Sequence, residues 1–358
     1  MFMGEGTGGE CMLKKLAGVV LAFILTVSFA GCGGNSEEPG AGEGTSGTGS
    51  GYSGQEYTLK LAHHLNDTHT ASEFAQEFAD LVEEESGGKI KIELYGNSQL
   101  GNQSENAEAV RMGTIDMCLN DFPTLATVYP KADVVALPYV FQDWENVEAF
   151  YESDPFREMI EDMAGEIGVR VIGPSMDAFR YIYSKEKIEN LDDMKSMKIR
   201  VPDVPLYVST FEALGCAPTP ISFSEMYTSL QTGVVDGLEN SNNTVYTSAL
   251  YEQVKYAAKT GHIFCDMSLM INESVYQGME EEARTIVAQC AEKAAQNHYQ
   301  RAIEADSEYE KLLEEEGMEF ADVDKEEFRE ACQGVWKEYT DNVEGGQELI
   351  DCIQSLTE

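Results

Sequence analysis

Residues 198–205 read K-I-R-V-P-D-V-P, and residues 211–240 read F-E-A-L-G-C-A-P-T-P-I-S-F-S-E-M-Y-T-S-L-Q-T-G-V-V-D-G-L-E-N. In a strand over the first segment, Arg200 lies on the face opposite to Ile199 and Val201. Pro202 ends that strand because proline has no backbone N–H to donate. Open α/β sheets hold their ligands at the carboxyl ends of strands, so Arg200 is expected near a cleft.

The second segment predicts a helix and a second strand end. Ser222-x-x-Glu225 has the pattern of a capping box that starts a helix, and Gly233 is expected to end it. The pair Glu239-Asn240 then follows a turn and places polar side chains beside another strand end. A cation, an aromatic ring and an amide can therefore converge on one cleft.

Each of these three side chains also has a purely structural interpretation. Arg200 can form an internal ion pair, Phe223 can belong to the core, and Asn240 can cap a turn. The residue types alone leave both interpretations open.

The amino terminus has the pattern of a secretion signal over residues 1–31. Lys14-Lys15 precede a short apolar run, which is followed by Gly31-Cys32. The ending F-A-G-C resembles a lipobox, so Cys32 is expected to be lipidated; a plain signal peptide or an uncleaved anchor is the alternative. Met12 directly precedes the more usual signal sequence, and the true start is Met1 or Met12.

Residues 32–56 are expected to form a flexible tether between the lipid and the folded part. The segment is rich in Gly, Ser, Thr and Glu and holds hardly any apolar residue that could form a core. A chain of 358 residues is long enough for two domains. We therefore expect a membrane-anchored lipoprotein on the outer face of the cytoplasmic membrane.

Charge and cysteine content exclude several classes of protein. The formal net charge is −40, which argues against nucleic acid or anionic lipid as a partner. The eight cysteines include no C-x-x-C pair, so neither a zinc knuckle nor a redox dithiol is indicated. In a chain of this size we expect buried free thiols rather than a disulfide framework.

Three histidines follow the strand predicted from Tyr57. His63, His64 and His69 lie close together with Asp67, which makes a metal site one interpretation. Adjacent histidines in a strand point to opposite faces, however, so joint chelation is awkward. We predict no metal here and keep the metal-binding or sensor lipoprotein as an alternative class.

Several long motifs resemble the substrate-binding proteins of TRAP transporters, the DctP-like family. The motifs are K-I-R-V-P, A-L-G-x-x-P-T-P, F-S-E-x-Y-x-x-L-Q-T-G-V-V-D-G, L-P-Y-x-F-x-D-W and the segment F-A-D-L-V-E-E-E-S-G-G-K-I-K-I-E-L-Y-G-N-S-Q-L-G. The resemblance implies an α/β, two-domain periplasmic-binding-protein fold of type II-like form, with hinge strands and a long cross-domain helix. It divides the chain into a first domain over 57–177, a second over 178–264, and returning segments over 265–358.

Periodicity predicts the main elements along the chain. The expected helices cover residues 73–85, 107–112, 156–167 and 280–316, and the expected strands cover 57–62, 89–95, 113–121, 169–173, 177–184 and 261–264. The helix over 280–316 contains no internal Pro or Gly and is long enough to span both domains.

The family resemblance also implies the positions of the ligand-binding residues. It assigns substrate binding to Arg200, Arg180, Asn240, Phe223, Asp121 and His64. It assigns a supporting buried network to Glu239 and His262 with Arg180. The family usually has proline after the Asn240 position, whereas Ser241 stands here, which alters the expected loop.

Together these observations predict a receptor rather than an enzyme. The sequence shows no nucleophile–base pair, phosphate loop or carboxylate dyad, and no cofactor is expected. A planar arginine suits a planar carboxylate, and two domains would close around the ligand. We expect a monomer that binds a sugar acid such as a uronate and is recognised by TRAP permease subunits. The alternatives are a C4-dicarboxylate or other keto or hydroxy acid, and, as another class, a lipoprotein enzyme on a similar frame.

Overall fold

The computed structural model describes residues 52–356. The predicted signal peptide, the lipidation site Cys32 and the tether up to residue 51 lie outside the described residues.

Packing begins earlier than the predicted end of the tether. Tyr52 is buried, and its hydroxyl donates to the Gln55 carbonyl over 2.8 Å. No helix within residues 52–356 combines the length and apolar character needed to cross a membrane.

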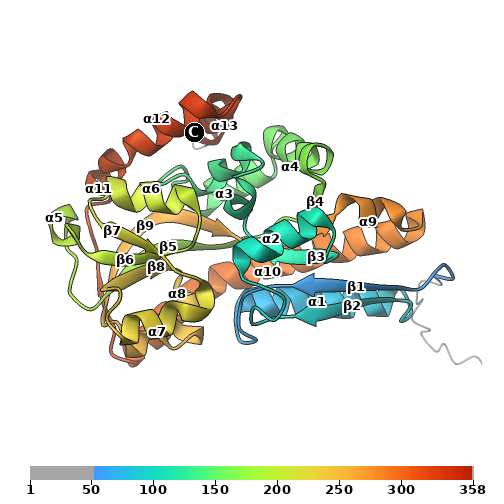
Figure 1. Cartoon of the computed structure of the whole chain (residues 1–358), viewed down its shortest axis with the longest axis horizontal. Coiled ribbons are helices and arrows are strands. Elements are labelled where there is room, and N and C mark those ends of the chain that lie inside the picture. The colour runs from blue at the N-terminus through green and yellow to red at the C-terminus, as the bar shows by residue number, and fades with distance from the viewer. Residues whose placement is uncertain (1–51, 357–358) are drawn as a thin grey trace, which may run out of the picture. The chain divides into compact units, whose positions relative to one another are not determined.

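Two β-sheets form the framework (Figure 1). The first sheet has the order β2-β1-β3-β10-β4 and the second has the order β11-β9-β5-β8-β6-β7. The strands of the first sheet are β1 (Tyr57–Ala62), β2 (Ile90–Tyr95), β3 (Met117–Asn120), β4 (Val169–Gly173) and β10 (Ser268–Asn272). Those of the second are β5 (Met176–Ser184), β6 (Lys198–Val201), β7 (Ala217–Pro220), β8 (Gly237–Asn240), β9 (Tyr256–Asp266) and β11 (Glu319–Ala321).

Thirteen α-helices accompany the sheets within the described part of the chain. They are α1 (Thr70–Glu85), α2 (Gln103–Met112), α3 (Trp144–Tyr151), α4 (Asp154–Ile167), α5 (Leu191–Met194), α6 (Pro205–Ala213), α7 (Met226–Gln231), α8 (Asn242–Thr247), α9 (Glu273–Gly278), α10 (Glu281–Glu315), α11 (Lys325–Ala331), α12 (Gln333–Asn342) and α13 (Gly346–Ser355). Short 3₁₀ turns cover Phe122–Leu125, Pro130–Ala136, Phe223–Glu225 and Leu250–Glu252.

The chain crosses between the sheets at two adjacent places. β4 ends at Gly173 and β5 begins at Met176, whereas β9 ends at Asp266 and β10 begins two residues later. Met176 pairs with Asp266, and Gly173 pairs with Leu269, so the two crossings lie side by side. Two short connections of this kind are the geometry of a hinge. The predicted domain limits remain a prediction.

The long helix α10 contacts elements of both sheets. It has 35 residues and is therefore about 52 Å long at 1.5 Å per residue. It packs against α1 and β4 on one side of the hinge and against α8 and β5 on the other. Small side chains such as Ala291, Ala294 and Ala295 are buried along it, which allows close packing. The prediction of one unbroken helix here is confirmed.

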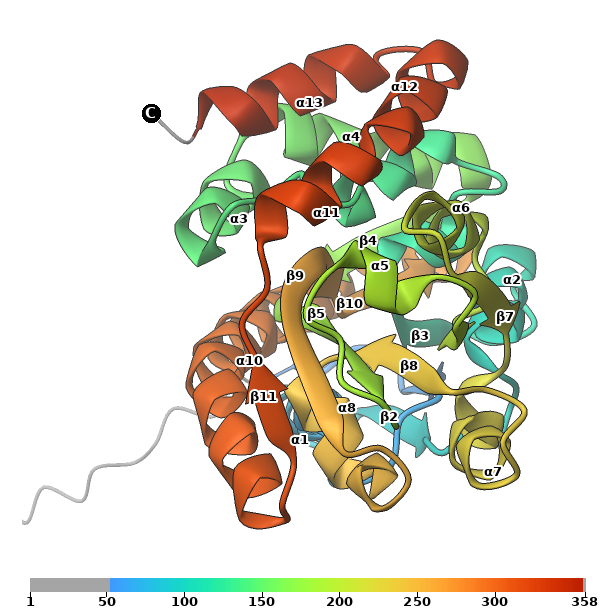
Figure 2. The same ribbon diagram turned by 90° about the vertical axis from the view of Figure 1, so that its left-hand side faces the viewer.

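The carboxyl-terminal helices return to the middle of the described chain. Figure 2 shows α11, α12 and α13 beside α3, α4 and α6, and α13 packs against α3 while α12 packs against α6. Phe328, Val335 and Ile350 from these helices are buried in a core that also contains Ile182 and Phe264 of the hinge strands. This shared core joins the carboxyl-terminal helices to the strands at the crossing.

Two local predictions are wrong in detail. The strand expected from Gly113 begins only at Met117, because Gly113 has φ 71° and ends α2 in the left-handed conformation. The Ser222–Glu225 box does not cap the next helix: their side chains bond each other, a 3₁₀ turn covers 223–225, and α7 begins at Met226.

Candidate ligand-binding site

The carboxyl ends of strands from both sheets meet at one small cavity with a volume of about 20 Å³. A cavity of this size holds about one water molecule, so its walls must move apart to admit a larger ligand. The cavity is lined by His64, Leu65, Gln103, Asp121, Asp177, Arg180, Arg200, Pro202, Phe223, Asn240, Thr244, Cys265 and Met267. All six residues predicted to bind substrate are among them. The structure therefore brings together side chains that are up to 176 positions apart in the sequence.

Arg200 is a buried cation without a carboxylate partner. It lies near the end of β6 and is 2% exposed, and its Nε donates to the Ile221 carbonyl over 2.8 Å. No ion pair to Arg200 is found among residues 52–356. Burial lowers the pKa of Arg200 to about 10, against the attraction of Glu239, so the guanidinium stays charged at neutral pH. Two of its nitrogens remain available to an acid.

Arg180, in contrast, already holds a carboxylate. Its Nε donates to Glu239 Oε2 over 2.5 Å, and its Nη2 donates to Glu239 Oε1 over 2.8 Å. The guanidinium also lies 5.2 Å from the ring centroid of Tyr207. Glu239 Oε2 is 3.6 Å from His262 Nε2, so the three residues predicted to form a supporting network are in contact.

The charges of this network oppose the effect of burial on Glu239. Burial alone raises the pKa of a carboxyl group, but the Arg180 charge and the hydrogen bonds from His262 and Arg180 lower it to about 2. For His262, burial outweighs the attraction of Glu239 and lowers the pKa. Glu239 and Arg180 are thus a charged pair in a buried place, and most of the Arg180 donor capacity is used inside the protein.

Oxygen-rich side chains form other parts of the cavity wall. Asp121 is 2% exposed and accepts a hydrogen bond from Gln103 Nε2 over 2.6 Å. Asp177 is 4% exposed and lies 3.4 Å from Nε2 of His298. Asn240 accepts from the backbone of Ser241 over 2.9 Å, which leaves its amide nitrogen with only a long contact to a methionine sulfur. Such groups exchange hydrogen bonds with hydroxyls.

The three clustered histidines have three different surroundings. His64 lines the cavity, where its ring meets Phe223 edge to face with centroids 5.0 Å apart. His69 caps α1, since its Nδ1 accepts from Ala71 N, and its Nε2 therefore donates to Thr244 Oγ1 over 3.1 Å. His63 lines a different hollow. No group of three or more His, Cys, Asp or Glu in the described chain is arranged to hold a metal ion.

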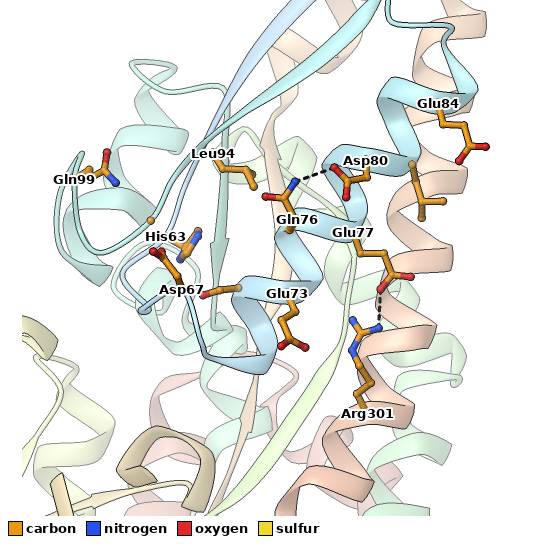
Figure 3. Close-up of a pocket in the computed structure, with 13 residues that line it drawn as sticks. His63, Asp67, Glu73, Gln76, Glu77, Asp80, Glu84, Leu94, Gln99 and Arg301 are labelled. Carbon is orange, nitrogen blue, oxygen red and sulfur yellow. Dashed lines mark hydrogen bonds and ion pairs between the residues drawn. The ribbon is translucent and has the colours of Figure 1, made fainter. Parts of the chain in front are cut away.

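That other hollow is larger, with a volume of about 740 Å³, but its charge is unsuited to an anion (Figure 3). Glu73, Glu77, Asp80 and Glu84 project into it from α1. Its one arginine, Arg301, is paired with Glu77 over 2.7 Å. An acidic ligand is repelled by such a wall, so the smaller cavity with the unpaired arginine is the better candidate.

Seven lining residues lie outside the predicted set. They are Leu65, Gln103, Asp177, Pro202, Thr244, Cys265 and Met267. Gln103 opens α2 directly after the capping box of Asn102 and Glu105, a pattern visible in the sequence. Asp177 is a charged residue in an otherwise apolar strand, three positions before Arg180. For Cys265 and Met267 the sequence holds no signal, since both look like core residues.

Comparisons with known proteins identify the family of the chain. The profile of the bacterial extracellular solute-binding proteins, family 7, matches residues 61–342. The sialic acid-binding periplasmic protein SiaP of Vibrio cholerae is 30% identical over 299 residues, which cover 84% of this chain and 92% of that protein.

Two solved structures with a similar fold carry sugar acids. A TRAP periplasmic solute-binding protein from Roseobacter denitrificans with bound L-galactonate is 30% identical with a TM-score of 0.78, covering 85% of this chain and 99% of that chain. Another from Haemophilus influenzae with bound L-gulonate is 27% identical with a TM-score of 0.80, covering 84% of this chain and 100% of that chain. The predicted two-domain α/β fold is confirmed. The chain therefore belongs to the bacterial extracellular solute-binding proteins of family 7, the solute receptors of TRAP transporters.

Proposed function

We propose that this receptor captures a sugar acid with one carboxylate, an aldonate or a uronate, and holds the carboxylate with Arg200. The observation that carries the proposal is the buried Arg200 guanidinium, which faces the cavity without an ion pair among residues 52–356. A planar carboxylate can accept two parallel hydrogen bonds from a planar guanidinium. Arg180 contributes at most through Nη1, whose long contact to Cys265 Sγ is 3.5 Å.

The other polar lining residues favour hydroxyl groups over a second carboxylate. Asp121 and Asp177 are acidic, and Asn240 and Gln103 are neutral amides. A C4-dicarboxylate requires a cation at each end, but Glu239 already neutralises Arg180. The hydroxyl groups of a sugar acid can donate hydrogen bonds to carboxylates and exchange them with amides. L-galactonate and L-gulonate, the ligands bound in two related structures, are polyhydroxylated acids of this kind. We therefore place the sugar hydroxyls beside Asp121 and Asn240.

Ligand binding would select a closed arrangement of the two sheets around the cavity. His64 and Asp121 belong to the part of the chain before the first crossing, and Arg200 and Asn240 follow it. A ligand that bonds to both sets stabilises their approach, and the closed form is what TRAP permease subunits would recognise. We propose that this occurs outside the cytoplasmic membrane, with Cys32 as the lipid anchor.

A thermal-shift screen of the purified protein tests the proposal. The panel is L-galactonate, L-gulonate, D-glucuronate, D-galacturonate, succinate and zinc chloride. A ligand at 100 times its dissociation constant adds about 2.7 kcal/mol to the free energy of unfolding. We expect at least one sugar acid to stabilise the protein and Arg200→Ala to lose that effect. Arg157→Ala is the control, because Arg157 is exposed and pairs with Asp154.

Two results would contradict the proposal. Stabilisation by succinate alone would assign a dicarboxylate, and Arg180 would then have to leave Glu239. Stabilisation by zinc alone would favour a metal-binding lipoprotein that uses the loop from His63 to His69.

A further inference from the structure

We propose that Asp121 takes up a proton from solution when the anionic ligand enters the cavity, so that ligand binding and proton binding are coupled. This inference rests on the proposed function, because it requires a ligand carboxylate at Arg200. It assigns to Asp121 a role beyond contact with hydroxyls: in its protonated form, the side chain becomes a hydrogen-bond donor to the ligand.

Asp121 lies at a point where the described chain offers little compensation for its charge. It follows β3 directly and is 2% exposed. The only side-chain hydrogen bond that its carboxylate accepts within residues 52–356 comes from Gln103, a neutral amide. No lysine, arginine or histidine of these residues lies within ion-pair distance of it.

A second buried carboxyl group is nearby, at the hinge. Asp266 is 1% exposed and ends β9, one residue before the crossing to the first sheet. Its Oδ1 accepts from the backbone N–H of Phe122, the residue after Asp121, over 3.1 Å. Its Oδ2 accepts from Ser268 Oγ over 2.9 Å. Asp266, too, has no ion-pair partner among the residues the structure describes.

A count of charges around the cavity shows why a proton is needed. The cations are Arg180 and Arg200, and Glu239 already cancels the first of them. Asp121 and Asp177 then face the single remaining positive charge of Arg200. A ligand carboxylate adds another negative charge to a space from which water is largely removed. In such surroundings like charges repel strongly, and protonation of one carboxyl group relieves the repulsion.

The titration behaviour of the two carboxyl groups supports this argument. Burial raises the pKa of Asp121 to about 6, although Gln103 and Arg180 oppose the shift, and Glu239 adds to it. Burial and the charge of Asp121 raise the pKa of Asp266 well above its usual range. Both shifts make protonation of this pair of carboxyl groups easier than that of exposed aspartates, and an added ligand carboxylate favours it further. The other titratable or charged groups that face Asp121 are Cys118, Asp133, Tyr151, Tyr207 and Cys265.

The coupling predicts how affinity depends on pH. Above about pH 6 the free site must bind a proton together with the ligand, so affinity falls by up to tenfold for each unit of rising pH. The fall ends where the pH exceeds the raised pKa of Asp121 in the complex. Below about pH 6, Asp121 is protonated in both states and this dependence disappears.

Titration calorimetry of the purified protein tests the inference. L-galactonate and L-gulonate are the first probes, followed by the two uronates of the thermal-shift panel. Each titration is run at pH 7 in phosphate and in Tris, whose heats of ionisation differ, which measures the number of protons taken up. We expect uptake approaching one proton for the wild type and near zero for Asp121→Asn. Asp322→Asn is the control, because Asp322 is an exposed acid near β11, and it should behave as the wild type.

Each outcome has a separate meaning. Sugar-acid binding without proton uptake overturns the coupling and leaves the proposed function standing. Release of a proton, with affinity that falls below pH 6, also overturns it and indicates that the bound ligand favours the ionised form of Asp121. Failure of every sugar acid to bind overturns the proposed function and the inference with it. If Asp121→Asn does not fold, the affinity of the wild type is measured from pH 5 to 8 instead. A fall of up to tenfold per pH unit above about pH 6 then supports the coupling, and an affinity independent of pH overturns it.

Discussion

The guanidinium of Arg180 and the carboxylate of Glu239 face each other in two parallel hydrogen bonds of 2.5 and 2.8 Å, with the glutamate side chain fully buried. Removing one partner of such a pair leaves an uncompensated buried charge. This relationship separates the two cavity arginines: one stabilises the scaffold, and the other is left for the ligand.

Glu239→Gln should therefore lower the free energy of unfolding by about 3–5 kcal/mol. The amide cannot balance the charge of Arg180, and the contact with His262 is weakened as well. Urea denaturation followed by circular dichroism measures the change. Asp341→Asn breaks an exposed ion pair with Lys337 and should change little. Equal losses of unfolding free energy in the two variants would show that the buried ion pair stabilises the protein no more than the exposed one.

Replacement of Arg200 by methionine should stabilise the ligand-free protein while it abolishes sugar-acid binding. The buried cation costs free energy that a side chain of similar length without charge does not, on the order of 1–3 kcal/mol given a pKa lowered to about 10. Melting temperatures with and without ligand give both results. A variant that is destabilised and still binds would show that Arg200 has a structural role instead.

His69→Asn should reduce the sensitivity of the protein to mild acid. Burial lowers the pKa of His69 to about 4, so the unfolded chain binds a proton there at higher pH than the folded protein does. Above about pH 6.5, His69 is neutral in both states and does not reduce the free energy of unfolding. As the pH falls from about 6.5 to 4, protonation of His69 in the unfolded chain lowers the free energy of unfolding by up to about 3 kcal/mol.

Asparagine keeps the helix cap of α1 but does not titrate. We therefore expect a shallower fall of the urea midpoint between pH 6.5 and 4 in His69→Asn than in the wild type. Parallel curves would assign the acid sensitivity to other groups, such as His63, whose pKa is also lowered by burial.

Alkylation should distinguish the cysteines of the folded protein. All six among residues 52–356 are free, and burial raises the pKa of Cys216 and Cys332 to about 12 and that of Cys290 to about 11. Cys216 and Cys352 are both partly exposed, but the raised pKa of Cys216 keeps its thiol protonated and unreactive at neutral pH. We expect iodoacetamide at pH 7.5 to modify Cys352 first and the others only in denaturant, as peptide mass mapping can show. Cys352→Ser should remove the fast reaction. Rapid modification of Cys265 in the folded protein would contradict the burial of this thiol in the cavity wall.

Elements with strong local signals could be predicted well from the sequence. The helix expected over 280–316 is observed as Glu281–Glu315, since no Gly or Pro interrupts a long run of good helix formers. The strands at Tyr57 and Val169 also lie where alternation predicts them. Boundaries that depend on a single conformation were less predictable, as the late start of β3 after Gly113 shows.

The candidate site could be predicted only where the family motifs carry it. Arg200 and Asn240 were found because they stand in long matching segments, and the cavity brings them together. The motifs do not reveal that Glu239 occupies Arg180 or that Asp177 shares the cavity. Both facts depend on which strands become neighbours, and β5 pairs with β8 and β9 across long sequence separations.

The aromatic packing around the hinge gives the protein an optical reporter of its own. Trp144 meets the rings of Phe179 on β5 and Phe264 on β9, with centroids 5.8 and 5.6 Å apart. The chain has only one other tryptophan, Trp336, whose indole N–H donates to the Pro138 carbonyl. Indole emission responds to the surroundings of the ring, so movement of the crossing strands should change the fluorescence of Trp144. Ligand capture can then be followed in real time without any added dye.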